Sequence, residues 1–143
     1  GRMAITPERV AINCDDFRIP DNKGNQPIDE MIVPDGPAAY FSTLPIKRIV
    51  MRLMAAGIPA QVSNSAGTFV CNHVFYGLMD FMKKEGKGRR GGFIHVPYLP
   101  KQAARLKNEP SMSLEMIVEG LTLAIKASVE IGVDERMTDG VEC

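Results

Sequence analysis

The sequence has no excess of charge of either sign. Its 17 lysine and arginine residues balance 17 aspartate and glutamate residues, so the formal net charge is zero. Proteins that bind nucleic acids or anionic membrane surfaces depend on a basic excess. The balanced charge therefore argues against both classes, and we expect no nucleic-acid partner and no membrane partner.

The sequence also lacks a long apolar run. No stretch is long enough to span a bilayer, and residues 1–10 (GRMAITPERV) lack the apolar core of a secretory signal peptide. Cysteine is scarce and irregularly spaced, at Cys14, Cys71 and Cys143, and the last is expected to be mobile at the chain end. An odd, irregular set argues against a disulfide framework and favours a reducing, cytoplasmic setting.

Length and composition are ordinary by contrast. The 143 residues are 45% hydrophobic and 24% charged, which suits one domain with a sizeable core. The chain does not begin with methionine, and its opening Gly-Arg is typical of the end of a glycine-rich turn. We therefore expect residues 1–143 to form a single α/β domain that is the C-terminal portion of a longer chain.

Apolar periodicity predicts three helices. The first spans residues 44–57, with Gly57 at its C-terminal end. The second spans about 68–84, and its predicted inward stripe is Val70, Val74, Leu78, Phe81 and Met82. The third spans about 112–130, is capped by Ser111 or Ser113, and has as its predicted inward stripe Leu114, Ile117, Val118, Leu121 and Ile125.

Short apolar or alternating stretches predict strands at residues 9–14, 58–63 and 92–97. Between the first strand and the first helix, residues 15–37 are dense in proline, glycine, aspartate and asparagine. This predicts a long loop, and loops of this length in compact domains are usually functional. Strands that alternate with helices predict an α/β fold with a largely parallel sheet.

Cys71 lies in the first turn of the second predicted helix, within the stretch SNSAGTFVCNHVFYGL at residues 63–78. Backbone N–H groups and the positive end of the helix dipole stabilise an anion in such a turn. A thiolate placed there can have a lowered pKa and act as a nucleophile, and the same N–H groups can hold an oxyanion. The alternative is a buried cysteine that only packs.

A cysteine nucleophile needs a base, and the chain has only two histidines. His73 is two residues from Cys71 on the same predicted helix, so it points to roughly the opposite face. His95 ends a short apolar strand, and ligand sites in open α/β sheets form at the carboxyl ends of strands. A Cys71–His95 pair would suit acyl transfer, although His95 could instead be a half-buried structural histidine.

A third group should orient the imidazole. Carboxylates are abundant in the first part of the chain, and their spacing does not choose among them. The candidates are Glu8, Asp15, Asp16, Asp21, Asp29, Glu30 and Asp35.

The segments around these candidates resemble one family. ITPERVAIN around Glu8, SNSAGTFVCNHVFYG around Cys71 and GGFIHVPYLP around His95 are similar to pyroglutamyl peptidase I, the pyrrolidone-carboxyl peptidases, and the resemblance covers essentially the whole chain. It implies a cysteine exopeptidase, with no metal and no cofactor, that removes N-terminal pyroglutamyl (5-oxoprolyl) residues from peptides. It also implies a triad of Cys71 as nucleophile, His95 as base and Glu8 as orienting acid.

The resemblance implies further properties. Arg18 would lie near the oxyanion, Ile19 would hold the lactam through its main chain, and Phe69 would line the pyroglutamyl pocket. The fold would be a three-layer, phosphorylase/hydrolase-like α/β fold with a central, mostly parallel twisted sheet flanked by helices. The N-terminal strands of the family fold are expected to be missing from this chain. Homotetramers are common in the family, so a homo-oligomer is expected.

Two other interpretations compete. One is a catalytically incomplete fragment of the same fold that acts as an oligomerising protein. The other is a nucleoside phosphorylase-like or peptidyl-tRNA hydrolase-like protein, which needs an anion-binding glycine loop or a basic face. The only short basic run, KGRRGG at residues 87–92, is more typical of a loop. Alkylation of Cys71 well below the pH at which an ordinary cysteine reacts would favour the peptidase.

Overall fold

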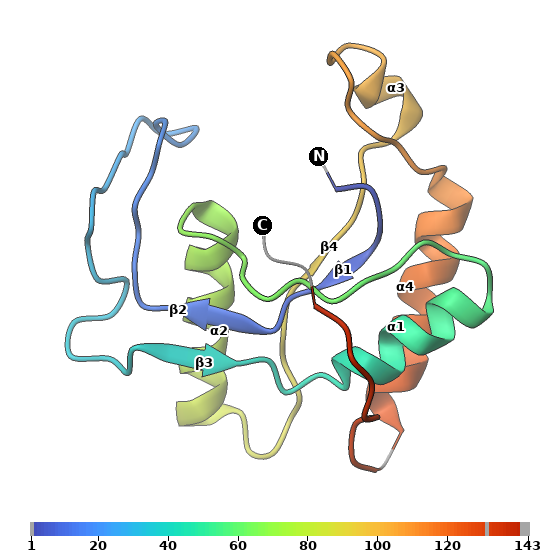
Figure 1. Ribbon diagram of the computed structural model, residues 1–143. Helices are drawn as coiled ribbons and strands as arrows, with labels where there is room; N and C mark the ends of the chain where they lie inside the picture. Colours follow the sequence, from blue (N-terminus) through green and yellow to red (C-terminus); the bar gives the residue numbers. More distant parts are fainter. Residues whose placement is uncertain (1, 131, 141–143) are drawn as a thin grey trace. The chain divides into compact units, whose positions relative to one another are not determined.

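The computed structural model describes residues 2–130 and 132–140, so Cys143, expected to be mobile, lies outside the described residues. The described chain falls into two compact units, each built from non-contiguous segments (Figure 1). The first unit contains residues 2–7, 45–63 and 94–140. The second contains residues 8–44 and 64–93. The backbone therefore passes from one unit to the other four times between residues 2 and 140.

Four short strands lie in the described chain: β1 (Thr6–Pro7), β2 (Val10–Ile12), β3 (Ala39–Phe41) and β4 (Ile94–His95). In the first unit β1 pairs with β4, and in the second unit β2 pairs with β3. Both pairings are antiparallel. Parallel bridges join Ile5 to Ala60 and Tyr98 to Ser111, and residues 5 and 7 also form backbone hydrogen bonds with residues 59, 61 and 63.

The expectation of a largely parallel sheet is therefore wrong for the two strand pairs that the structure describes, β1 with β4 and β2 with β3. Alternation identifies residues that favour extended backbone, but it does not identify their partners or direction. A chain reversal suffices to make an antiparallel pair, and the loop between β2 and β3 supplies one. The strand pattern at residues 9–14 is confirmed, but Ala11 is the fully buried residue, and Val10 and Ile12 are only half-buried.

The helices are α1 (Ile46–Ala55), α2 (Val70–Glu85), α3 (Pro100–Ala103) and α4 (Leu114–Val129). The predicted helix positions are confirmed. Gly57 follows α1 with a φ of +74°, a conformation that favours glycine, and the Ser113 hydroxyl caps α4 by accepting the Met116 N–H. No helix in residues 2–130 and 132–140 combines the length and apolar character needed to cross a membrane.

In the first unit α1 packs against α4 (Figure 1). The predicted inward face of α4 is confirmed at Ile117, which is buried, and in part at Leu121, which is half-buried, but the other buried residues of α4 are Gly120, Ala124 and Ala127. A side chain at Gly120 would place its Cβ 2.4 Å from Ile5 Cδ1, so a larger residue there would require the end of the Ile5 side chain to move. The large side chains lie on the outer face and are exposed: Leu114, Val118 and Ile125.

The predicted inward stripe of α2 is also wrong. Val74 and Phe81 are 51% and 54% exposed, whereas Phe75 and Tyr76 are fully buried and pack with Ala11 of β2. Helix α2 is apolar around much of its circumference, so periodicity offers more than one stripe. The polar partners of the second unit select the buried face: the Tyr76 hydroxyl donates to the Pro37 carbonyl at 2.6 Å.

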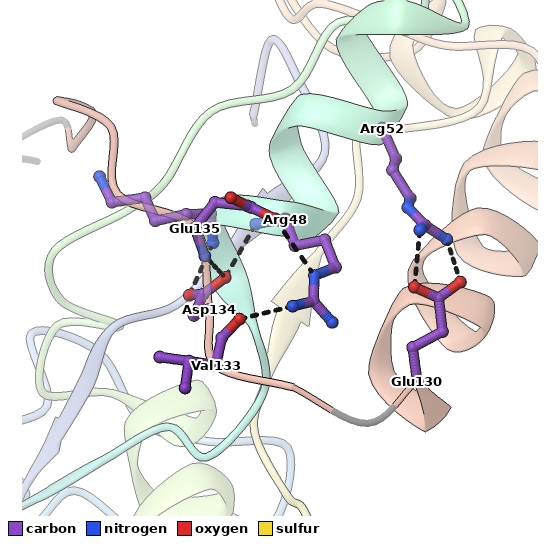
Figure 2. Close-up of polar contacts among 7 residues, drawn as sticks. Arg48, Arg52, Glu130, Val133, Asp134 and Glu135 are labelled. Carbon is purple, nitrogen blue, oxygen red and sulfur yellow. Dashed lines mark hydrogen bonds and ion pairs between the residues drawn. The ribbon is translucent and has the colours of Figure 1, made fainter.

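The start of α1 is capped from far along the chain. Pro45 precedes α1 and makes no capping bond through its side chain. The carboxylate of Asp134 accepts the N–H groups of Lys47 and Arg48 at 3.1 and 2.9 Å (Figure 2). A carboxylate at this position both satisfies helix-end donors and complements the helix dipole. The segment after α4 thus stabilises the first turn of α1.

We expect Asp134→Ala to lower the free energy of unfolding by about 1–2 kcal/mol, since it removes a helix cap. Urea unfolding at neutral pH measures this change. Glu135→Ala is the matched control, because Glu135 is half-exposed and lies 3.8 Å from Arg48 Nε; its effect should stay within about 0.5 kcal/mol. Equal effects of the two substitutions would contradict the capping role.

Candidate active site

Cys71 is the second residue of α2, and its side chain is half-buried. Phe69 precedes the helix in an extended conformation and makes no capping bond through its side chain. Since no side-chain oxygen caps this end at Phe69, the first turn concentrates backbone N–H donors and partial positive charge around the thiol. The predicted placement of Cys71 in the first helical turn is confirmed.

Two segments of the chain line a cavity of about 470 Å³, and one of them directly precedes this turn. One wall consists of Asp16, Arg18 and Ile19, and the other consists of residues 66–69. The three residues predicted to contact substrate or oxyanion, Arg18, Ile19 and Phe69, therefore share one cavity in the second unit. Gly67 has a φ of +78° and no atom within 4 Å of an added Cβ, so this wall is open.

Reciprocal hydrogen bonds hold the two walls together. The Asp16 N–H donates to the Thr68 carbonyl at 3.0 Å, and the Thr68 hydroxyl donates to the Asp16 carbonyl at 2.9 Å. Next to this pair, the rings of Phe17 and Phe69 meet edge to face with centroids 4.6 Å apart. These contacts fix the separation of the walls, and so the width of the cavity.

The other two triad candidates lie on different units. Glu8 belongs to the second unit, is fully buried, and donates its backbone N–H to the Phe93 carbonyl at 2.9 Å. His95 belongs to the first unit, is half-buried, and lies opposite Thr6 in the β1–β4 pair. The structure thus brings together the cavity residues and the turn that carries Cys71. The association of Cys71, His95 and Glu8 is a proposal.

His73 has a different neighbour. Its Nδ1 lies 2.6 Å from Oδ2 of Asp15, a carboxylate that is only 6% exposed. Both residues line a second cavity of about 610 Å³ in the same unit. A carboxylate at this distance orients the imidazole through Nδ1, so this nitrogen of His73 is already engaged by Asp15. Sequence reasoning gave no sign of this pair, because the two residues are 58 positions apart.

Cys14 makes a useful comparison with Cys71. Burial, and then the carboxylates of Asp29, Asp16 and Asp15, raise the pKa of the Cys14 thiol above its usual value. A thiol that resists ionisation is a poor nucleophile near neutral pH. Of the two half-buried cysteines in the described chain, Cys71 is therefore the one whose surroundings suit chemistry.

Asn72 is a site residue that the sequence analysis missed. Its side chain is fully buried and forms three hydrogen bonds with the backbone of Ile12 and Cys14. It joins the turn that carries Cys71 to the end of β2 and the start of the cavity wall. An asparagine beside a cysteine in a helix has no sequence signature for this role, because its partners are about 60 positions away.

Known proteins match this chain over nearly its whole length. A model of the pyroglutamyl peptidase family matches residues 1–131. A pyrrolidone-carboxylate peptidase of Vibrio parahaemolyticus is 59% identical over all of this chain, which covers 66% of that protein. One from Bacillus cereus is 58% identical over 94% of this chain, which covers 62% of that protein.

Solved structures match it as well. Pyroglutamyl peptidase I from Bacillus amyloliquefaciens superposes with a TM-score of 0.92 at 54% identity, over 96% of this chain and 65% of that chain. Pyrrolidone carboxyl peptidase from Thermococcus litoralis gives 0.89 at 44% identity, over 96% of this chain and 66% of that chain. The chain thus spans about two thirds of the length of these relatives, and the α/β class expected from the sequence is confirmed. It belongs to the pyroglutamyl peptidase family.

Proposed function

We propose that this chain acts as a cysteine exopeptidase that removes N-terminal pyroglutamyl residues from peptides. Cys71 is the nucleophile, His95 the general base and acid, and Glu8 the group that orients the imidazole. One observation carries the proposal: Arg18, Ile19 and Phe69 line a single cavity directly before the turn that carries Cys71. Membership of the pyroglutamyl peptidase family supports it.

The chemistry is acyl transfer in two steps. His95 takes the proton of Cys71, and the thiolate attacks the carbonyl carbon of the pyroglutamyl residue. The N–H groups of the first α2 turn and the Arg18 guanidinium stabilise the oxyanion of the tetrahedral intermediate. His95 then protonates the departing amine, and a water that His95 deprotonates releases the acyl group from Cys71. Glu8 holds the imidazole and stabilises its charged form. The scheme uses no metal and no organic cofactor.

The cavity suits a neutral lactam. A pyroglutamyl ring carries no free α-amine, so its site needs an apolar wall and backbone groups for the lactam N–H and C=O. Phe69 supplies part of the apolar wall, and the main chain at Ile19 supplies a polar partner. An ammonium in the same place would lose part of its hydration beside the positive charge of Arg18, and Asp16 would be the one carboxylate of the lining that could partner it.

The test compares three substrates that carry the same amide leaving group on a pyroglutamyl, a glutaminyl or a prolyl residue. The pyroglutamyl substrate should be cleaved, whereas the glutaminyl and prolyl versions should show kcat/KM values at least about 100-fold lower, because each carries an ammonium. Phe69→Ala should raise KM more than it lowers kcat, since it removes binding that ground and transition states share. Efficient cleavage of the prolyl substrate would show that the site is not built for a neutral lactam.

Three further properties implied by the family resemblance are proposals: a homotetramer, a cytoplasmic location and a three-layer arrangement of the fold. Sedimentation of the purified chain tests the first, fractionation of cells that express it tests the second, and a crystal structure tests the third. A monomer in sedimentation would contradict the oligomer without touching the chemistry proposed for Cys71.

A further inference from the structure

The Asn72 side chain completes the hydrogen bonding of a strand edge. Its Oδ1 accepts the Ile12 N–H at 2.9 Å, and its Nδ2 donates to the Ile12 carbonyl at 2.9 Å and to the Cys14 carbonyl at 3.0 Å. The amide therefore pairs with β2 as a neighbouring strand would. All three bonds lie within the second unit, and the side chain is fully buried.

This amide belongs to a longer seam between residues 12–16 and residues 68–72. The seam consists of the three Asn72 bonds and the two reciprocal bonds between Asp16 and Thr68. The segment 12–16 leads directly to Arg18 and Ile19 of the cavity wall, and the segment 68–72 contains Phe69 and Cys71. Any slip along the seam would move the nucleophile relative to the wall.

We propose that Asn72 is a positioning residue that sets the register of Cys71 against the wall formed by Asp16, Arg18 and Ile19. The proposal rests on the function proposed for Cys71. Asn72 is covalently next to Cys71, and its amide spans two acceptors two residues apart on the facing segment, so its bonds define one register. Removing the amide leaves the Ile12 N–H and two carbonyls without this partner and releases the turn to shift.

A destabilising effect alone would not identify a positioning role, so the test needs a matched asparagine. Asn13 provides it. Its side chain also makes three hydrogen bonds to backbone within the second unit, to both polar groups of Val33 and to the Gly36 carbonyl. These bonds tie the end of β2 to the turn at residues 33–36 and do not involve α2. Asn13→Ala thus removes a similar set of side-chain bonds from the same unit while leaving the three bonds of Asn72 in place.

The experiment compares Asn72→Ala with Asn13→Ala in three measurements: urea unfolding, turnover of a pyroglutamyl amide, and the pH dependence of iodoacetamide labelling at Cys71, read by peptide mass spectrometry. Asn72→Ala should lower kcat by about 10²-fold, the scale of a 1 Å misplacement, with a smaller change in KM. It should also raise the pH midpoint of Cys71 labelling, because the first turn of α2, whose N–H groups and dipole favour an anion, is no longer held in one place around the thiol. Asn13→Ala should lower stability, but because the three Asn72 bonds remain, it should lower kcat and shift the labelling midpoint much less than Asn72→Ala does.

Thr68→Val is the second variant. It removes only the hydroxyl bond to the Asp16 carbonyl with little change in shape, and it should shift kcat and the labelling midpoint in the same direction by a smaller amount. It keeps the proposal testable if Asn72→Ala does not fold. Equal changes in the Asn72 and Asn13 variants, or a folded Asn72→Ala with unchanged labelling and kcat, would overturn the proposal. If the parent protein cleaves no pyroglutamyl amide, the labelling comparison still tests the positioning role by itself.

Discussion

Cys71→Ser is expected to abolish release of a chromophore from a pyroglutamyl amide, with kcat reduced by ~10⁴-fold or more. A serine hydroxyl ionises at a far higher pH than a thiol, and His95 is a base suited to a cysteine. The substitution changes one atom in a half-buried turn, so the fold should survive. Steady-state kinetics, with circular dichroism to confirm folding, measures the effect.

The remaining cysteines provide the controls. Cys14→Ser should keep activity near that of the parent, because burial and neighbouring carboxylates raise the pKa of the Cys14 thiol and make it a poor nucleophile. Cys143→Ser should also keep activity. Turnover by Cys71→Ser at the rate of the parent, or loss of turnover in Cys14→Ser alone, would refute Cys71 as the nucleophile.

The second large effect concerns the histidines. His95→Ala should lower kcat by about 10²–10⁴-fold, the range contributed by general acid–base catalysis. His73→Ala should lower kcat only a few-fold, since the His73 imidazole is held 2.6 Å from Asp15 and is not assigned a role in proton transfer. The pH profile of kcat/KM separates the two, because only loss of the base should remove its acidic limb.

Stability provides the control for this comparison. His73→Ala removes the imidazole partner of a nearly buried carboxylate and should therefore lower the urea midpoint. A His73→Ala protein that unfolds more easily but turns over normally would agree with the assignment. Equal losses of kcat in the two variants would contradict it.

The positions of the helices were predictable, but their buried faces were not. Three apolar periodic segments gave α1, α2 and α4 within a few residues, because helix formation is encoded locally. The buried face of α4 packs at Gly120 against Ile5, a residue that lies more than a hundred positions earlier in the chain. Strand direction depends on partners elsewhere in the chain, such as Phe41 for Val10 and His95 for Thr6, so antiparallel pairing could not be read from alternation.

The candidate site was likewise predictable only in part from the sequence. A helix start at Cys71 followed from local pattern, and the structure confirms it. The grouping of Arg18, Ile19 and Phe69 followed from family resemblance, since nothing local links residues 18 and 69. The roles of Asn72 and of the Asp15–His73 pair were not predictable, because side-chain hydrogen bonds across about 60 positions leave no periodic trace.

The cap on α1 joins two segments that leave the ribosome at different times. The Asp134 carboxylate binds N–H groups 87 and 86 positions earlier in the chain. At a synthesis rate of about 5–20 residues per second, α1 exists for roughly 4–17 s before its capping carboxylate is made. Over that interval water is the substitute partner of those N–H groups. A nascent chain arrested before residue 134 should therefore be cut within α1 by proteases more readily than a chain extended beyond that residue, so the order of synthesis leaves α1 vulnerable until Asp134 has been made.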